Sequence, residues 1–159
     1  MMVDVAIALG SNLGDSLAIL ENAVADLSRE NGIELLAKSA WYKTKAIGPP
    51  QPDYLNGCIT CRVALEPEVL LNILQAIENC YGRQRTEHWG ARTLDLDLIL
   101  YGQQVIDLPH LQVPHPLMKE RVFVLMPLTE IAADWVEPVS LKTIRYWGDR
   151  LSTDDIQRL

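Results

Sequence analysis

Two aspartates, Asp95 and Asp97, alternate with leucines in the segment TLDLDLILYG, which spans residues 93–102. This alternation predicts a β-strand, in which residues i and i+2 point to the same side. Their Cα atoms would then lie about 6.6 Å apart, given a rise of about 3.3 Å per residue. Carboxylates at this spacing can bind one hard cation such as Mg²⁺, or hold two such ions between them. The pattern predicts a core face of Leu94, Leu96, Leu98 and Leu100, and an opposite face of Thr93, Asp95, Asp97, Ile99 and Tyr101.

The segment that precedes this strand is rich in basic residues. It contains Arg83, Arg85, His88 and Arg92 against a single acid, Glu87, in a chain whose net charge is −7. Guanidinium groups beside paired carboxylates are typical of a phosphate site, in which arginines bind some oxygens and metal ions neutralise the remaining charge. The spacing alone leaves an alternative open, a solvated basic loop followed by an edge strand with two exposed acids.

The size and composition of the chain limit its possible functions. With 159 residues and 48% hydrophobic content, we expect residues 1–159 to form one domain that buries its core without a metal or a disulfide. A pI near 4.9 argues against nucleic acid or an anionic membrane as the main partner. The first residues form a short apolar run interrupted by Asp4, which fits neither a signal peptide nor a membrane span. We therefore expect a cytoplasmic protein.

The three cysteines, Cys58, Cys61 and Cys80, are odd in number and lie in apolar segments, which predicts free thiols. The spacing of Cys58 and Cys61 resembles a redox or zinc motif. Within a strand, however, positions i and i+3 face opposite sides about 10 Å apart, too far for a disulfide. A zinc site would need a second pair of ligands at similar spacing, which the sequence lacks. These cysteines are therefore interpreted as buried structural residues.

The hydrophobic patterns predict an α+β protein. Strands are expected at residues 3–9, 33–44, 54–65 and 94–101, with a short return strand at 104–106, and helices at 17–31, 66–82, 121–133 and near 141–147. The order β-α-β, β-α-β predicts a ferredoxin-like βαββαβ sheet, with helices packed on it and a C-terminal helical extension. The turn GSNLGD at residues 10–15 is interpreted as a tight turn plus a helix N-cap, because it lacks the lysine of a phosphate-binding loop. A proline-rich loop is expected at residues 107–116.

Several motifs resemble those of the 6-hydroxymethyl-7,8-dihydropterin pyrophosphokinase family. They are GSNLGD at residues 10–15, PDYLN at 52–56, QAIENCYGR at 75–83, WGARTLDLDLILYG at 89–102, and VPHPLMKERVFVLMPLTEIAA at 113–133. The resemblance implies transfer of diphosphate from ATP to the hydroxymethyl group of a reduced pterin, giving AMP, as a step of folate synthesis. It further implies two Mg²⁺ ions, and ATP and 6-hydroxymethyl-7,8-dihydropterin as small-molecule substrates. We expect a monomer that binds neither nucleic acid nor membranes.

The resemblance also implies roles for individual residues. Asp95 and Asp97 match the pair that holds both magnesium ions, and Arg83 and Arg92 match loop arginines that engage phosphates during catalysis. Asp97 is also the nearest candidate to accept the hydroxyl proton, unless metal binding makes a dedicated base unnecessary. The implied nucleotide-binding residues are Gln75, Glu78, Arg85, Leu98, His115 and Arg121. The implied pterin-binding residues are Thr44, Ile47, Tyr54, Asn56, Trp89 and Phe123, in which Tyr54 and Phe123 would sandwich the ring.

The residues taken alone leave other interpretations open. Gln75 and Glu78 could form the polar face of a helix, Leu98 and Phe123 could be core residues, and His115 could be an ordinary loop residue. The chain departs from the family pattern at Lys45-Ala46, where many members have proline, and at Pro116, where an aromatic residue often follows the histidine. A metal-dependent phosphohydrolase would use the same acids and arginines but would not need the two aromatic rings. A non-catalytic ligand sensor would need neither the acids nor the arginines.

Overall fold

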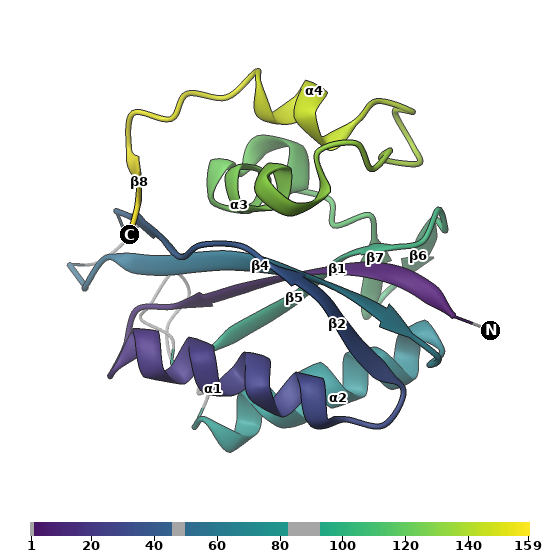
Figure 1. Ribbon diagram of the computed structural model, residues 1–159, viewed down its shortest axis with the longest axis horizontal. Coiled ribbons are helices and arrows are strands. Elements are labelled where there is room, and N and C mark those ends of the chain that lie inside the picture. Colours follow the sequence, from purple (N-terminus) through teal and green to yellow (C-terminus); the bar gives the residue numbers. More distant parts are fainter. Residues whose placement is uncertain (1, 46–49, 83–92) are drawn as a thin grey trace.

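The computed structural model describes residues 2–45, 50–82 and 93–159. In these residues, a six-stranded sheet is covered by helices on both faces (Figure 1). The sheet contains β1 (Val3–Ser11), β2 (Ile33–Lys38), β3 (Tyr42–Thr44), β4 (Tyr54–Val63), β5 (Asp95–Tyr101) and β8 (Ile156–Arg158). The strands β6 (Ile106–Leu108) and β7 (Leu111–Val113) form a separate hairpin. The helices are α1 (Ser16–Arg29), α2 (Pro67–Cys80), α3 (Val122–Ala132) and α4 (Ile144–Gly148), with a 3₁₀ turn η1 (Met118–Glu120).

The main sheet is antiparallel throughout its described pairs. Its strands follow the order β5-β1-β4-β3-β8, and β2 also pairs with β4, at the other end of that strand from β3. Strand β1 is therefore enclosed between β4 and β5, which come from distant parts of the sequence. This arrangement places residues of three sequence regions in single rows across the sheet.

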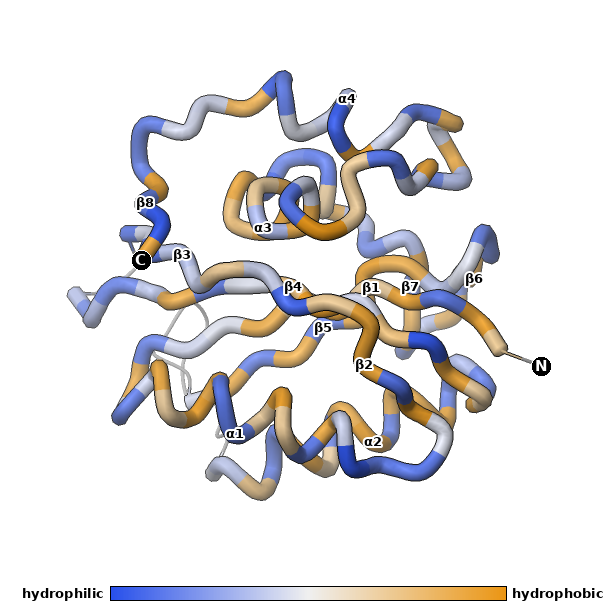
Figure 2. Tube along the Cα trace, in the orientation of Figure 1, coloured by the Kyte–Doolittle hydropathy of each residue, from blue (hydrophilic) through white to orange (hydrophobic). Residues whose placement is uncertain are grey.

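Helices α1 and α2 cover one face of the sheet. The N-cap of α1 is Asp15, whose carboxylate accepts a hydrogen bond from the amide of Ala18 at 3.3 Å, as the turn prediction required. A buried stripe then recurs at helical spacing, formed by Leu20, Ala23, Val24 and Leu27 in α1 and by Leu70, Leu74 and Ile77 in α2. These residues pack against Ile7, Leu9 and Ile59 of the sheet. Figure 2 shows the apolar sides of both helices turned towards the strands.

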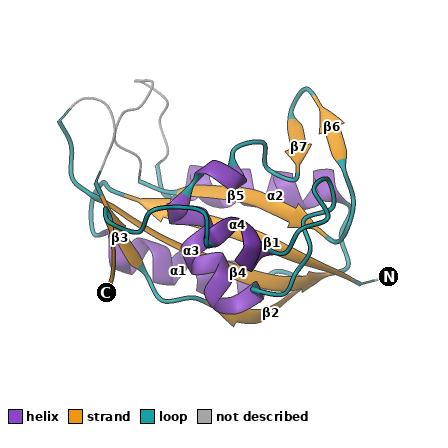
Figure 3. Cartoon of the chain, turned by 90° about the horizontal axis from the view of Figure 1, so that it is seen from above, coloured by secondary structure: helices purple, strands orange, loops and turns teal. Residues whose placement is uncertain are grey.

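Helices α3 and α4 cover the opposite face. Their apolar residues, including Leu125, Leu128 and Ile144, pack on Ala6 and Cys58 of the sheet. Seen from above, the two helices lie over the middle of the sheet, and the hairpin of β6 and β7 projects beyond it (Figure 3). None of the helices in the described part of the chain has both the length and the apolar character needed to cross a membrane.

The predicted alternation of β5 is correct as far as Ile99 and wrong for Leu100 and Tyr101. Leu98 pairs with Ile7 of β1, but Leu100 pairs with Ala6, so the register shifts by one residue at Ile99. A β-bulge of this kind adds one residue to a strand and reverses the side to which later residues point. Tyr101 therefore joins the core beneath α1 and α2, and Leu100 joins the core beneath α3.

Other predicted elements differ from the structure in their bounds. The strand predicted at 33–44 is divided into β2 and β3, because Ser39 bonds to both the amide and the carbonyl of Cys58 and breaks the extended run. The return strand predicted at 104–106 was expected to pair with the strand before it, but β6 pairs with β7 instead. Strand β7 lies inside the segment that was predicted to be a loop, residues 107–116. The sequence analysis missed β8, whose three residues are too short to show a periodic pattern.

The interpretation of the cysteines is confirmed. Cys58 and Cys61 are fully buried on opposite faces of the sheet, and Cys80 is exposed; all three are free. Burial raises the pKa of the Cys61 thiol to about 12. Burial, with a smaller contribution from the negative charge of Asp97, also raises the pKa of Cys58. Both thiols therefore remain protonated.

Candidate active site

The two aspartates lie on the α3 face of the sheet. Asp95 pairs with Gly10 of β1, and Asp97 pairs with Ala8. Residues opposite one another in an antiparallel ladder point to the same face, and Ala8 packs in the core beneath α3. Both acids are half-buried. The prediction that they share one strand face is confirmed.

Asn56 of β4 belongs to the same row of the sheet as Asp95. Gly10 of β1 pairs with Asp95 on one side and with Asn56 on the other. A Cβ atom added to Gly10 would lie 2.7 Å from Nδ2 of Asn56, so the amide occupies the space that a side chain at position 10 would fill. Asn56 is only 8% exposed. The missing side chain of Gly10 thus allows the Asn56 amide to extend over β1, towards β5.

Thr44 and Tyr54 extend this surface at the ends of β3 and β4. They pair with each other, and Tyr42 pairs with Asn56. Period-two alternation along each strand then places Thr44, Tyr54 and Asn56 on one face. Thr44 Oγ1 donates a hydrogen bond to Asn56 Oδ1 at 3.2 Å, which orients the amide oxygen. The structure brings these three predicted pterin-binding residues together.

The segment between β7 and α3 contributes His115, Arg121 and Phe123. The amide of His115 donates to the carbonyl of Ile99 at 3.0 Å, which fixes the histidine beside β5. The guanidinium carbon of Arg121 lies 5.5 Å from the centroid of the Phe123 ring. Phe123 lies in the first turn of α3 and is partly buried against the core of that face. A cation and an aromatic ring are thus presented together at the start of the helix.

His115 is neutral in the folded protein. Burial first, and the nearby charge of Arg121 second, lower its pKa from 6.5 to about 4. Its Nδ1 accepts a hydrogen bond from the amide of Leu117 at 3.2 Å, so in the neutral ring Nε2 carries the proton. The ring therefore offers an N–H donor, for example to an oxygen of a bound anion, over the physiological pH range.

Glu78 supports the strand that carries the aspartates. It is 3% exposed, and its Oε2 accepts a hydrogen bond from the amide of Leu96 at 2.7 Å. Leu96 lies between Asp95 and Asp97, so the bond fixes the backbone from which both carboxylates project. The interpretation of Glu78 as part of a polar helix face is wrong, because the side chain is buried. Gln75 is exposed on the same helix, and Leu98 is buried in the core beneath α1 and α2.

Asn12 is a supporting residue that the sequence analysis missed. It is 2% exposed, and its Nδ2 donates to Oε1 of Gln51 at 2.8 Å and to the carbonyl of Pro52 at 2.9 Å. These bonds hold the segment that enters β4 immediately before Tyr54. The sequence did carry a signal for this role, because Asn12 is a polar residue directly after a buried strand. The sequence analysis assigned it only to the turn at residues 10–15.

Five predicted site residues lie outside the described residues, namely Ile47, Arg83, Arg85, Trp89 and Arg92. Residues 2–45, 50–82 and 93–159 contain no group of three or more histidines, cysteines or acids arranged to hold a metal ion.

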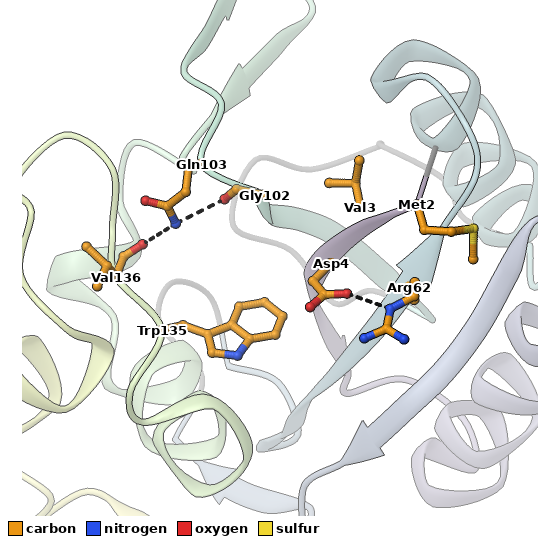
Figure 4. A pocket seen from close by; sticks show the side chains of 8 residues that line it. All are labelled: Met2, Val3, Asp4, Arg62, Gly102, Gln103, Trp135 and Val136. Carbon is orange, nitrogen blue, oxygen red and sulfur yellow. Dashed lines mark hydrogen bonds and ion pairs between the residues drawn. The ribbon is translucent and has the colours of Figure 1, made fainter.

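A hollow of about 660 Å³ lies at the opposite end of the same sheet face (Figure 4). Its polar groups bond to one another: Arg62 pairs with Asp4 at 3.0 Å, and Gln103 donates to the carbonyl of Val136 at 2.9 Å. The hollow is lined by Met2, Val3, Asp4, Arg62, Gly102, Gln103, Trp135 and Val136. None of the predicted site residues lines it, so the candidate site is placed at the other end, where Asp95 and Asn56 lie.

Comparison with known proteins is consistent with this assignment. The family model described as 7,8-dihydro-6-hydroxymethylpterin-pyrophosphokinase matches residues 6–133. Proteins named 2-amino-4-hydroxy-6-hydroxymethyldihydropteridine pyrophosphokinase are similar to the chain. The Synechocystis protein is 54% identical over 87% of this chain and 71% of its own length. The Haemophilus influenzae protein is 45% identical over 87% of this chain and 88% of its own length. The Bacillus subtilis protein is 39% identical over 94% and 93%.

Solved structures of HPPK-DHPS proteins share the fold. One from Plasmodium falciparum matches with a TM-score of 0.80 at 12% identity, covering 99% of this chain and 47% of that chain. Another HPPK-DHPS structure matches with a TM-score of 0.76, and the match covers 100% of this chain and 47% of that chain. This chain therefore spans about half the length of those solved chains. The likeness to these structures concerns the fold alone, and the class of enzyme comes from the family match over residues 6–133. The chain belongs to the 7,8-dihydro-6-hydroxymethylpterin-pyrophosphokinase family, whose members are transferases.

The state of His115 can be tested by NMR. We expect the ring to titrate with a pKa near 4 and to carry its proton on Nε2 at pH 7. Because the unfolded chain binds this proton at a higher pH, folding stability should fall as the pH is lowered from about 6.5 towards 4. Long-range ¹H–¹⁵N spectra of the parent, assigned with a His115→Asn variant, would measure both properties. A titration near 6.5, or a proton on Nδ1, would contradict the assignment.

Proposed function

We propose that this chain transfers a diphosphate group from ATP to the hydroxymethyl group of 6-hydroxymethyl-7,8-dihydropterin. The products would be AMP and the pterin diphosphate, in a step of folate synthesis. One observation carries the proposal: the residues covered by the family match include Asp95, Asp97 and Asn56, which share one face of the sheet.

Asp95 and Asp97 are suited to hold Mg²⁺, and we propose two such ions. Carboxylate oxygens are the ligands that this cation prefers, the two acids point to one face, and Glu78 fixes the strand between them. Bound Mg²⁺ would neutralise charge on the phosphate oxygens of ATP.

The proposed pterin site lies between β4 and the start of α3. Tyr54 and Phe123 would sandwich the flat ring, with each stacking contact contributing about 0.5–1.5 kcal/mol beyond the burial of area. The amide of Asn56, oriented by Thr44, has both a donor and an acceptor for the polar edge of a pterin. Ile47 and Trp89 would complete this site.

The proposed nucleotide site extends along β5. His115 would donate from Nε2, and Arg121 would contribute a positive charge, to the phosphates or the ribose. Arg85 would assist them, and Arg83 and Arg92 would engage the phosphates during transfer. Gln75, Glu78 and Leu98 would lie towards the nucleoside, a placement supported by the bond that joins α2 to β5 at Leu96.

The reaction would proceed by in-line displacement at the β-phosphorus of ATP. The hydroxymethyl oxygen forms a bond to the β-phosphorus. The bond between the β-phosphorus and the oxygen that bridges to the α-phosphate breaks, so AMP leaves with that bridging oxygen. Asp97 is the candidate to accept the hydroxyl proton. Positioning of the two substrates and stabilisation of the developing negative charge would supply most of the rate enhancement.

We further propose a ferredoxin-like topology, which treats β2 and β3 as one interrupted strand. The order of elements is then βαββαβ, and β1 lies between β4 and β5. The proposal includes residues 1–159 acting as a single domain, as a cytoplasmic monomer whose partners are ATP and the pterin.

Replacement of the aspartates tests the proposed function. Asp95→Asn and Asp97→Asn should each lower AMP formation by about 100-fold or more, because a neutral amide replaces a charged metal ligand poorly. Their melting temperatures without Mg²⁺ should stay within about 3 °C of the parent. Asp4→Asn is the matched control, since Asp4 lies on the same face at the far end of β1. The function is wrong if either folded variant makes AMP from ATP and the pterin at the parental rate in saturating Mg²⁺.

The space above Gly10 provides a separate test of the pterin site. Gly10→Ala should displace the Asn56 amide and weaken pterin binding by about 1–3 kcal/mol, because a buried hydrogen-bonding group is lost to the ligand. ATP affinity should change less. Gly148→Ala is a control of similar steric demand, since its added Cβ would lie 2.8 Å from Oγ1 of Thr129, within the packing of α4 on α3. Calorimetric titration measures both ligands, and equal losses for ATP and pterin would contradict the placement.

A further inference from the structure

One carboxylate on α3, that of Glu130, binds three separate groups at the sheet edge. Its Oε1 accepts a hydrogen bond from the hydroxyl of Tyr42 at 2.6 Å. Its Oε2 accepts one from the amide of Ala40 at 3.0 Å and lies 3.8 Å from Nη2 of Arg158. The side chain of Glu130 is 27% exposed, so these bonds are partly shielded from water. Glu130 therefore connects α3 to β3 and to the C-terminal strand β8.

The strand that Glu130 binds forms one side of the proposed pterin site. Tyr42 pairs with Asn56 on one side and with Arg158 on the other. Thr44, two residues further along β3, donates to Asn56 and pairs with Tyr54. A shift of β3 relative to α3 would thus move the row of residues that surrounds the pterin.

The helix that carries Glu130 forms the other side of the site. Phe123 lies seven residues earlier in α3, which is about two turns and places both residues on the same side of the helix. Phe123 and Tyr54 are the proposed sandwich, and their separation depends on the height of α3 above β3 and β4. Burial, followed by the hydrogen bond to Glu130, raises the pKa of Tyr42 to about 12, so its hydroxyl remains a donor at neutral pH.

The C-terminal strand strengthens this connection. Thr44 pairs with Ile156, and the amide of Leu159 donates to the carbonyl of Trp41 at 2.9 Å. Strand β8 therefore occupies the outer edge of β3 and supplies Arg158 to the carboxylate. These residues lie beyond residue 133, where the family match ends, so the family motifs do not describe them.

We infer that Glu130, with Tyr42 and Arg158, is a positioning group that sets the width of the pterin site between α3 and the β3–β4 edge. This inference rests on the proposed function, because it assigns the space between Tyr54 and Phe123 to the pterin. A group that merely stabilised the fold would affect ATP and pterin alike when removed. A positioning group at this place should affect the pterin selectively.

Tyr42→Phe isolates the contribution of the hydrogen bond, since the ring stays in place and only the hydroxyl is lost. Tyr81→Phe is the matched control: its hydroxyl donates to Oδ2 of Asp26 at 2.7 Å and joins α2 to α1 on the other side of the sheet. We expect Tyr42→Phe to raise the pterin Kd about fivefold, with the ATP Kd within about twofold of the parent. Tyr81→Phe should leave the Kd values for ATP and for the pterin within about twofold of the parent, even if it lowers the melting temperature as much as Tyr42→Phe does.

Three results would overturn the inference: an unchanged pterin Kd in Tyr42→Phe, an equal loss of ATP and pterin affinity, or the same pterin loss in Tyr81→Phe. If Tyr42→Phe does not fold, Glu130→Gln carries the same comparison, because the amide keeps one oxygen acceptor. If the parent protein makes AMP and Tyr42→Phe binds the pterin as tightly as the parent, only this inference is refuted. A parent that binds no pterin and makes no AMP would refute the proposed function as well.

Discussion

The pairing of β1 with both β4 and β5 is the constraint on which the rest of the site depends. It places Gly10 between Asn56 and Asp95 and so brings three distant sequence segments into one row of the sheet. A side chain at position 10 would meet the Asn56 amide. The backbone ladder therefore sets the distance between the proposed metal ligands and the group that would recognise the pterin. In the proposed reaction, which depends mainly on positioning, this fixed spacing would contribute directly to catalysis.

Two glutamate carboxylates fix the elements around this row, the buried Glu78 and the partly exposed Glu130. Glu78 binds the amide of Leu96 from beneath the sheet, between the two aspartates. Glu130 binds Tyr42 and Ala40 from above, at the opposite edge. The carboxylate of Glu78 is removed from water and so makes a strong, directional bond to its backbone donor, and loss of either glutamate takes an acceptor away from its donors. The two glutamates therefore restrain β5 and β3, the strands on either side of the β1–β4 pair.

The parts of this structure that depend on local patterns could be predicted from the sequence. Asp95 and Asp97 share a face because alternation is a property of one strand, and Tyr54 and Asn56 lie together in the motif PDYLN. Thr44 lies outside the quoted motifs and was assigned only through the family resemblance. The β-bulge at Ile99 could not be predicted, because it is defined only by the pairing of β5 with β1. The contact between Glu130 and Tyr42 joins residues 88 positions apart, and the hydrogen bonds of Asn12 cross about 40 positions. Neither leaves a periodic signal.

The most direct test of this account is an experimental structure with Mg²⁺, a non-hydrolysable ATP analogue and 6-hydroxymethyl-7,8-dihydropterin bound together. The account predicts that oxygens of both Asp95 and Asp97 coordinate the metal, that the pterin lies between Tyr54 and Phe123 with its polar edge on Asn56, and that the hydroxymethyl oxygen faces the β-phosphorus. Metal bound away from the two aspartates, or a pterin bound at another face of the sheet, would contradict it.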